Sequence, residues 1–301
     1  PLTARQIPGR GTAYAILAEV YAWIAGYGQE PEYYALGIEA AGKVIGDPNY
    51  RLVASPEEVC TEVLPGNSEE GIFEVCYDDS RGEYKDFESY IGGTVEKWPV
   101  LKGTTPASRR KFFIRNETVE RLYTPEDLRL QAYFADFFRM KEEPVSVTQG
   151  AAYVRMWREV EYYSGGIYDG TPRTLLANDI LIRLPDILLL RAEMKAATGD
   201  REGAVADLDV VRRRAGVAGY SEAEGDLRRA IQLERDRELL FQTGVRYFDY
   251  MRNHTYNLLK GGFRDLTETD VAAGALFLPV SLDAMNNNPK VKQTAYWVGK
   301  F

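Results

Sequence analysis

Apolar and small residues recur at helical spacing in two stretches near the start of the chain, residues 12–25 and 31–45. Pro31 lies near the start of the second stretch, where its missing amide hydrogen costs nothing. The small residues Gly37 and Ala40 would let two helices approach each other closely. The pattern therefore predicts an antiparallel helix pair here.

The same design recurs over residues 184–215, where Gly199 and Asp200 mark a turn between two helical stretches. Ala192 and Ala204 lie twelve residues apart, which is the spacing of the small positions in a tetratricopeptide repeat. A generic helix hairpin would produce the same spacing. Two such units with the same order of small residues favour helical repeats.

A third helical stretch covers residues 226–252, and Thr243-Gly244 is expected to divide it into two helices. The charged residues 234–238 offer ion pairs at helical spacing, which predicts a solvated, salt-bridged face. No second acid or pocket marks a catalytic carboxylate pair. The expected core positions of this stretch are Leu227, Ile231, Leu239, Leu240, Phe241 and Phe248.

The segment between the helix pairs, about residues 70–178, is less regular and rich in aromatic and turn residues. Residues 72–77 alternate in polarity, which predicts a strand. A second short strand is expected at 154–157, a helical turn at 125–128 and a flexible aromatic loop at 162–166. Because long loops on rigid scaffolds concentrate binding residues, we expect this insertion to carry the function.

Charge and rare residues exclude several functions. The 301 residues carry 37 basic and 45 acidic side chains, a net charge of −8, which argues against nucleic-acid binding. His254 is the single histidine, so a histidine zinc site is nearly excluded. We expect this residue at a helix end. Cys60 and Cys76 could pair or stay reduced. No apolar run reaches the roughly 18 residues of a membrane span.

Seven short motifs, in order along nearly the whole chain, resemble those of the SusD/RagB family of outer-membrane nutrient-binding lipoproteins. Arg191 departs from the family's usual Tyr or Asn. The chain also lacks the family's lipoprotein signal, lipidated cysteine and N-terminal helical part, so we expect it to be the later portion of such a protein. The motifs are Arg10-Gly11-Thr12-Ala13, residues 37–45, Asn67-Ser68-Glu69-Glu70-Gly71, Asp127-x-Arg129, Ile182-Arg183-Leu184-Pro185-Asp186, Glu234-Arg235-Asp236-Arg237-Glu238 with Gly244-Val245-Arg246, and Leu278-Pro279-Val280 followed by Asn288-Pro289 and Gln293.

The resemblance implies a mainly α fold of tetratricopeptide-like helix pairs, a SusD-like α-α superhelix, with a loop-rich insertion containing short strands. It implies one domain over 1–301, with helical units at about 12–45, 184–215 and 226–252. It further implies a non-catalytic protein on the cell surface, held by a lipid anchor that is not part of this chain. Such a protein delivers glycans to a SusC-like TonB-dependent transporter and needs no cofactor or metal.

Sugars present apolar faces edged by hydroxyl groups, so aromatic rings and polar side chains together form their binding sites. Residues 78–98 offer this chemistry on one loop. A second cluster lies at 157–163. The alternative for each aromatic is burial in a small core of the insertion. The candidates are Trp98, Tyr84, Tyr90, Phe87, Asp78 and Arg81, followed by Trp157, Tyr162 and Tyr163.

Two other functions remain open from the sequence. A helical-repeat scaffold that binds a peptide or protein would use a concave groove lined by helix residues, with the loops uninvolved. An all-α glycosidase would need two positioned carboxylates in a pocket. Nothing in the sequence singles out such a pair, so the enzyme is the weakest of the three hypotheses.

Overall fold

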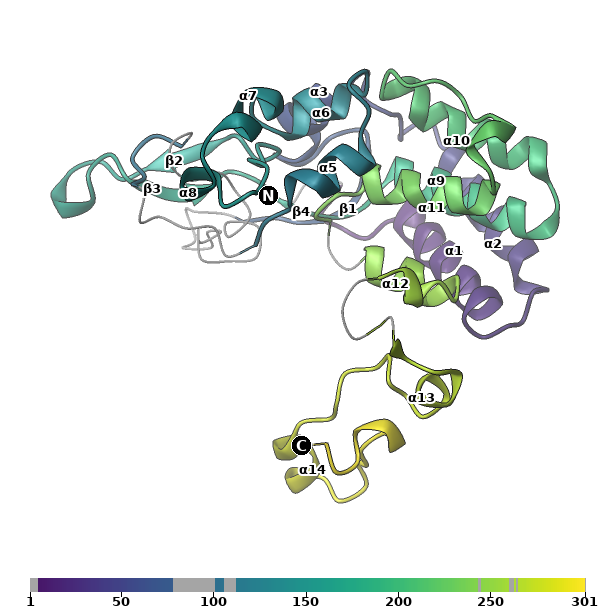
Figure 1. Cartoon of the computed structure of the whole chain (residues 1–301). Helices are drawn as coiled ribbons and strands as arrows, with labels where there is room; N and C mark the ends of the chain where they lie inside the picture. Colours follow the sequence, from purple (N-terminus) through teal and green to yellow (C-terminus); the bar gives the residue numbers. More distant parts are fainter. Residues whose placement is uncertain are drawn as a thin grey trace. The chain divides into compact units, whose positions relative to one another are not determined.

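The computed structural model describes residues 5–77, 101–105, 112–242, 245–259, 263 and 265–300 (Figure 1). The chain divides into two compact units. Unit 1 comprises Pro1–Ala25 and Glu30–Thr243, and unit 2 comprises Gly26–Gln29 and Gly244–Phe301. The assignment of 1–301 to one domain with three repeat units stays a prediction.

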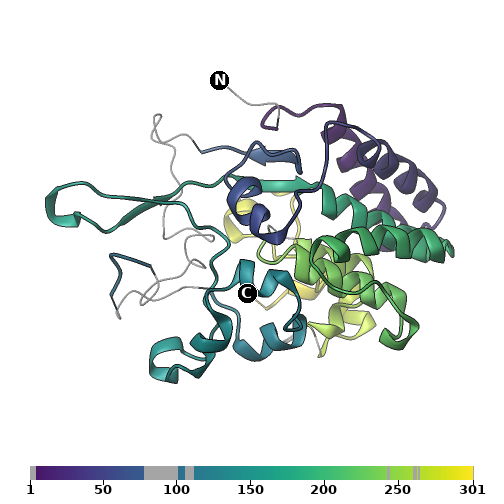
Figure 2. The same cartoon turned by 90° about the horizontal axis from the view of Figure 1, so that it is seen from above.

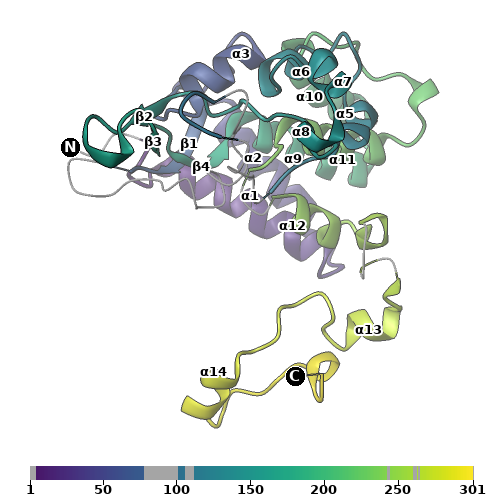
Figure 3. The same ribbon diagram turned by 60° about the vertical axis from the view of Figure 1, so that its left-hand side comes forward.

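Three helices form the first part of unit 1: α1 (Arg10–Gly26), α2 (Tyr33–Ile45) and α9 (Leu184–Thr198), which Figures 1 and 3 show close together. Alanines of α1 and α2 share a buried cluster with apolar residues of α9. A Cβ at Gly37 would lie 2.4 Å from Met194 Sδ and 3.3 Å from Tyr21 Cβ. Both predicted helices are confirmed, and glycine permits their close approach.

The second helix pair, α9 and α10 (Arg201–Arg214), is also confirmed. Gly199 ends α9 with φ 86°, a conformation that glycine adopts without strain. The Asp200 side chain then caps α10 by accepting from the Gly203 N–H. Ala192 and Ala204 are fully buried in one cluster with α11 (Leu227–Glu238), so the predicted small positions do lie at the helix contact.

The third helical stretch breaks earlier than predicted. Helix α11 ends at Glu238, five residues before Thr243, and α12 (Val245–Arg252) begins in unit 2. Leu239 and Leu240 are buried as expected. Phe248 is 51% exposed, so its predicted core position is wrong, because α12 instead buries Asp249 and Arg252 as an ion pair.

The region from 70 to 178 is more helical than predicted. Residue 154 makes only an isolated bridge to Phe134, so the strand expected at 154–157 is wrong, whereas the strand expected at 72–77 is confirmed as β1. Two antiparallel pairs form, β1 with β4 and β2 with β3. Together with the flanking residues 56–63 and 179–183, the region contains α3 (Pro56–Glu58), a π-helical turn (Val59–Val63), β1 (Gly71–Val75), α5 (Asn116–Leu122), α6 (Leu128–Tyr133), α7 (Phe137–Glu142), α8 (Val145–Thr148), β2 (Val160–Tyr162), β3 (Pro172–Leu175) and β4 (Asp179–Arg183).

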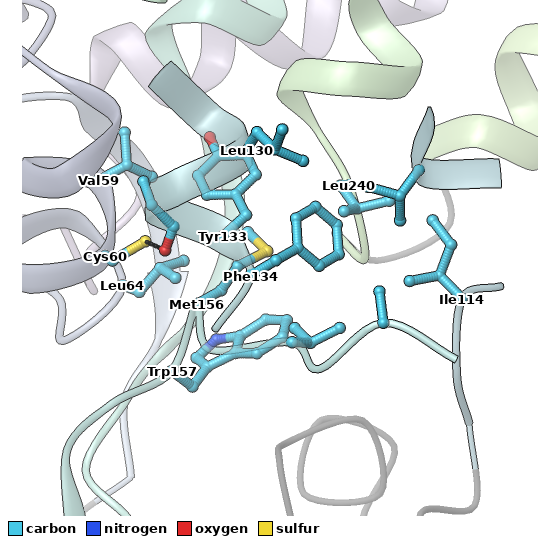
Figure 4. Close-up of a cluster of buried hydrophobic side chains, with 14 of the residues drawn as sticks. Val59, Cys60, Leu64, Ile114, Leu130, Tyr133, Phe134, Met156, Trp157 and Leu240 are labelled. Atoms are coloured by element: carbon cyan, nitrogen blue, oxygen red, sulfur yellow. Dashed lines mark hydrogen bonds between the residues drawn. The ribbon is translucent and has the colours of Figure 1, made fainter. Parts of the chain in front are cut away.

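These short elements enclose a core of their own, in which Figure 4 shows Tyr133, Phe134, Met156 and Trp157 side by side. Cys60 lies in the same cluster, and burial raises the pKa of its thiol to about 12. Cys60 and Cys76 are both free, so the two thiols do not pair.

Unit 2 contains α12, α13 (Glu268–Ala272) and α14 (Leu282–Asn287). His254 follows the end of α12 by two residues, as expected, where its ring stacks on Tyr27 and its Nε2 lies 3.2 Å from the Gly26 carbonyl oxygen. Across the described parts of both units, no helix combines the length and apolar character needed to cross a membrane.

Candidate functional site

The charged residues 234–238 do not form a solvated face. Glu234 and Glu238 are fully buried, and Arg235 and Asp236 are nearly so. That prediction was wrong because the partners of these charges come from segments that helical spacing within α11 cannot reveal.

Three arginines and three glutamates form a buried cluster, which we call the Arg–Glu cluster. Its members are Glu70, Arg129, Arg183, Arg214, Glu234 and Glu238. Arg183 Nη1 lies 2.7 Å from Glu70 Oε1 and 2.5 Å from Glu238 Oε1. Arg129 Nη1 lies 2.7 Å from Glu234 Oε1 and 3.3 Å from Glu238 Oε2. Arg214 pairs with Glu70 and Glu238.

The arginines of the cluster hold Glu234 and Glu238 as anions. Burial opposes ionisation of Glu238, but the guanidinium groups of Arg214, Arg183 and Arg129 outweigh it and lower the pKa of Glu238 to about 2. The pKa of Glu234 is also lowered, since Arg129, Arg237 and Arg212 outweigh its burial. A general acid needs a raised pKa near the working pH, so this cluster is built for structure and not for proton transfer.

The predicted aromatic loop cannot be compared with the structure. Trp98, Tyr84, Tyr90, Phe87, Asp78 and Arg81 all lie outside the described residues. Within the second predicted cluster, Trp157 is 4% exposed in the core of Figure 4, so it is not available to a ligand. Tyr162 is half-buried and Tyr163 is 41% exposed.

Tyr163 belongs to a hairpin that extends away from the helices of unit 1 (Figures 1 and 2). Strands β2 and β3 pair antiparallel, and hydrogen bonds close the tip: Tyr163 N–H to the Thr171 carbonyl oxygen and Gly170 N–H to the Tyr163 carbonyl oxygen, both 2.9 Å. A Cβ at Gly103 would lie 2.1 Å from the Gly170 carbonyl oxygen, so the backbone at Gly103 passes directly against the hairpin at Gly170 and Thr171.

The hairpin tip presents two tyrosine rings to solvent. The ring centroids of Tyr163 and Tyr168 are 5.7 Å apart, with the planes tilted by 40°. Tyr168 is 60% exposed and Ile167 90%. Gly165 and Gly166 both take positive φ, which turns the chain tightly enough to bring the rings together. Sequence reasoning missed Tyr168, although the glycine pair between two tyrosines was a visible signal.

Two cavities of unit 1 lie outside the hairpin. One, of about 490 Å³, is lined by residues that include Glu58, Glu62 and Glu69, and by Arg51, which forms an ion pair with Glu69. The other, of about 650 Å³, is lined by Arg5, Arg10, Asp47 and neighbouring polar residues. No cluster of histidine, cysteine or acidic side chains within the described ranges could hold a metal ion.

The sequence model of the SusD family matches residues 69–297. The chain resembles a SusD homologue of Bacteroides thetaiotaomicron with a TM-score of 0.82 and 22% identity, covering 97% of this chain and 61% of that structure. No curated protein matches.

Two other solved structures are named surface glycan-binding protein A. The one from Bacteroides thetaiotaomicron gives a TM-score of 0.66 at 21% identity, over 94% of this chain and 64% of that one. The one from Bacteroides uniformis gives a TM-score of 0.67 at 22% identity, over 95% of this chain and 60% of that one. The chain spans about three fifths of the length of these structures. By its family match and its mainly helical fold, this chain belongs to the SusD family.

Proposed function

We propose that this protein binds oligosaccharides at the cell surface and delivers them to a SusC-like TonB-dependent transporter without cleaving them. Two SusD-like structures that share its fold are named surface glycan-binding proteins, which supports the ligand class. The lipid anchor, the outer-membrane location and the transporter belong to the same proposal.

The observation that carries the proposal is the exposed Tyr163–Tyr168 pair. Two solvent-facing rings 5.7 Å apart give an apolar surface with a hydroxyl on each rim. Sugar rings pack their C–H faces on such surfaces while their hydroxyl groups bond to the rims. The closed hydrogen bonds of the tip hold the two rings in place before the ligand arrives, which reduces the entropy lost on binding.

The test is affinity electrophoresis of the complete gene product through gels containing a panel of soluble polysaccharides. Tyr168→Ala is expected to abolish the retardation caused by the bound glycan, and Tyr168→Phe to retain most of it. Phe138→Ala is the matched control, because Phe138 is an aromatic of unit 1 with a similar exposure of 54%. Retardation that is unchanged in Tyr168→Ala would remove the hairpin from the site.

The loop residues predicted from the sequence are tested beside the hairpin. Trp98→Ala is expected to weaken the binding of the same glycan. Tyr84→Ala is expected to have the next largest effect. Binding that survives all of these variants would favour the peptide-binding scaffold. Release of reducing sugar by the purified protein would instead establish a glycosidase and contradict a purely binding role.

The transporter step has its own test. A tagged form of the complete protein, purified from detergent-solubilised outer membranes, is expected to bring with it a TonB-dependent barrel protein. Recovery without any barrel, from membranes that contain one, would contradict the delivery step and leave glycan binding unaffected.

A further inference from the structure

The cavity of about 650 Å³ in unit 1 has an excess of positive charge. Of its charged lining residues, Arg5 and Arg10 are cations and Asp47 is an anion, while Asn49, Tyr50 and Asn67 add neutral polar groups. The chain as a whole carries a net charge of −8, so an anionic ligand is repelled unless such a local excess of cations receives it.

Arg5 is held in a fixed orientation without being neutralised. Its Nε donates to the Ser68 carbonyl oxygen at 2.9 Å and its Nη2 to the Asn49 carbonyl oxygen at 2.7 Å. The guanidinium carbon lies 4.6 Å from the centroid of the Tyr50 ring. These partners are all uncharged, and Arg5 forms no ion pair with a residue of the described ranges. Its positive charge remains available to a ligand.

The Arg10 side chain is exposed and makes neither a hydrogen bond nor an ion pair within the part of the chain that the structure describes, although its charge helps to lower the pKa of Asp47. The one carboxylate of the cavity is already engaged, because Asp47 Oδ1 accepts from the Asn49 backbone N–H at 3.0 Å and from Asn49 Nδ2 at 2.8 Å. The cavity therefore has two guanidinium groups and one carboxylate, and that carboxylate already accepts hydrogen bonds from Asn49.

Asn67 adds a neutral polar group to the wall. Its backbone has φ 59°, a left-handed conformation that asparagine tolerates better than most residues, and its N–H donates to the Glu74 carboxylate at 2.8 Å. Its side-chain amide makes no hydrogen bond to any described residue. The amide is thus free to bond a hydroxyl group of a ligand.

We infer that this cavity is a second saccharide site, selective for a sugar that carries a carboxylate. Guanidinium groups bind carboxylates with strong charge-assisted hydrogen bonds, which assigns the acid group to Arg5 and Arg10 and the hydroxyls to Asn67. A volume of about 650 Å³ is of the size that small-molecule sites have. The inference rests on the proposed function only in taking the ligand to be a saccharide.

The test is calorimetry with three probes: galacturonic acid oligomers, neutral galactose oligomers of the same length, and inorganic phosphate. Arg10→Gln is expected to lower the affinity for the galacturonate oligomers at least tenfold. Arg121→Gln, which removes an equal charge from an exposed position on α5, is expected to change their affinity less than twofold. Tyr168→Ala should leave galacturonate binding at this cavity intact.

The inference would be overturned by equal galacturonate affinity in Arg10→Gln and the parent protein, or by loss of galacturonate binding in Tyr168→Ala alone. It would also be overturned if phosphate bound as tightly as galacturonate, or if the protein bound neutral glycan but no galacturonate. In the last case the proposed function stands and only the second site fails. Failure of every saccharide in the panel would overturn both.

Discussion

Arginine occurs in two opposite settings in unit 1. Arg183 has no exposed side-chain surface and lies between Glu70 and Glu238, with which it forms ion pairs of 2.7 and 2.5 Å. Arg10 is exposed at the wall of a cavity, and its side chain forms no ion pair with a described residue. The same side chain therefore serves the fold in one place and remains available to a ligand in the other.

The difference follows from desolvation. A charge removed from water must be compensated by its partners, and a buried pair that loses one member leaves the other charge uncompensated. Arg10 keeps its water and needs no partner to be stable. Stability measurements and binding measurements should therefore respond to the two arginines in opposite ways.

The largest effect is expected at Glu238. Glu238→Gln removes the charge shared by Arg129, Arg183 and Arg214, and should lower the free energy of unfolding by about 3–5 kcal/mol. Urea unfolding followed by circular dichroism measures this. Glu62→Gln, an exposed glutamate of the same unit, is the control and should change it by less than about 0.5 kcal/mol. Equal effects in the two variants would contradict the role of the cluster.

Acid is expected to act on the same cluster. The pKa of Glu238 is about 2 in the folded protein and 4.5 in its ordinary state, so the unfolded chain takes up the proton first as the pH falls. The stabilisation of the folded state by ionised Glu238 is therefore complete above pH 4.5 and is lost as the pH falls from 4.5 to 2. It amounts to at most about 3 kcal/mol. Urea midpoints measured across this range should fall less steeply in Glu238→Gln.

An intermediate effect is expected at Arg191, the residue that departs from the family's usual Tyr or Asn. Its Nε and Nη2 donate to both oxygens of Asp207 at 2.8 and 2.7 Å, and its side chain is 19% exposed. Arg191→Ala should cost about 1–2 kcal/mol, since Lys195 Nζ, 2.9 Å from Asp207, keeps the carboxylate paired. A loss as large as that of Glu238→Gln would show that Lys195 does not compensate.

The smallest effect on stability is expected at Arg10. Arg10→Gln should leave the thermal midpoint within about 2 °C of the parent protein, because only a solvent-screened electrostatic interaction with Asp47 is lost. Differential scanning calorimetry checks this. A large fall in the midpoint would place Arg10 with the structural arginines and weaken its assignment to a ligand.

The helix pairs were predictable because their signals are local. Gly199 and Pro185 mark the ends of α9, and Ala192 meets Ala204 across a short turn. The burial of residues 234–238 was not predictable in this way. Arg183 reaches Glu238 from 55 residues away and Glu70 from 113, and helical spacing contains no information about such partners.

The sequence proposed aromatic residues for the site but could not say which of them are exposed. Aromatic residues near polar groups on a loop were predicted to bind sugars, and of the cluster Trp157, Tyr162 and Tyr163 the structure exposes Tyr163, at the hairpin tip. Trp157, from the same predicted cluster, faces a core built from residues as distant as Cys60 and Leu240. Exposure of an aromatic depends on these long-range contacts, so composition alone could not separate the two.

The environment of Cys60 also offers a practical reporter. Its thiol is buried and stays protonated near neutral pH, whereas Cys76, the other cysteine of the chain, is half-buried. A maleimide dye should therefore label the native protein at Cys76 alone and reach Cys60 only when the core opens. The rate at which a second equivalent of dye reacts counts opening events directly, without any ligand and without an engineered residue.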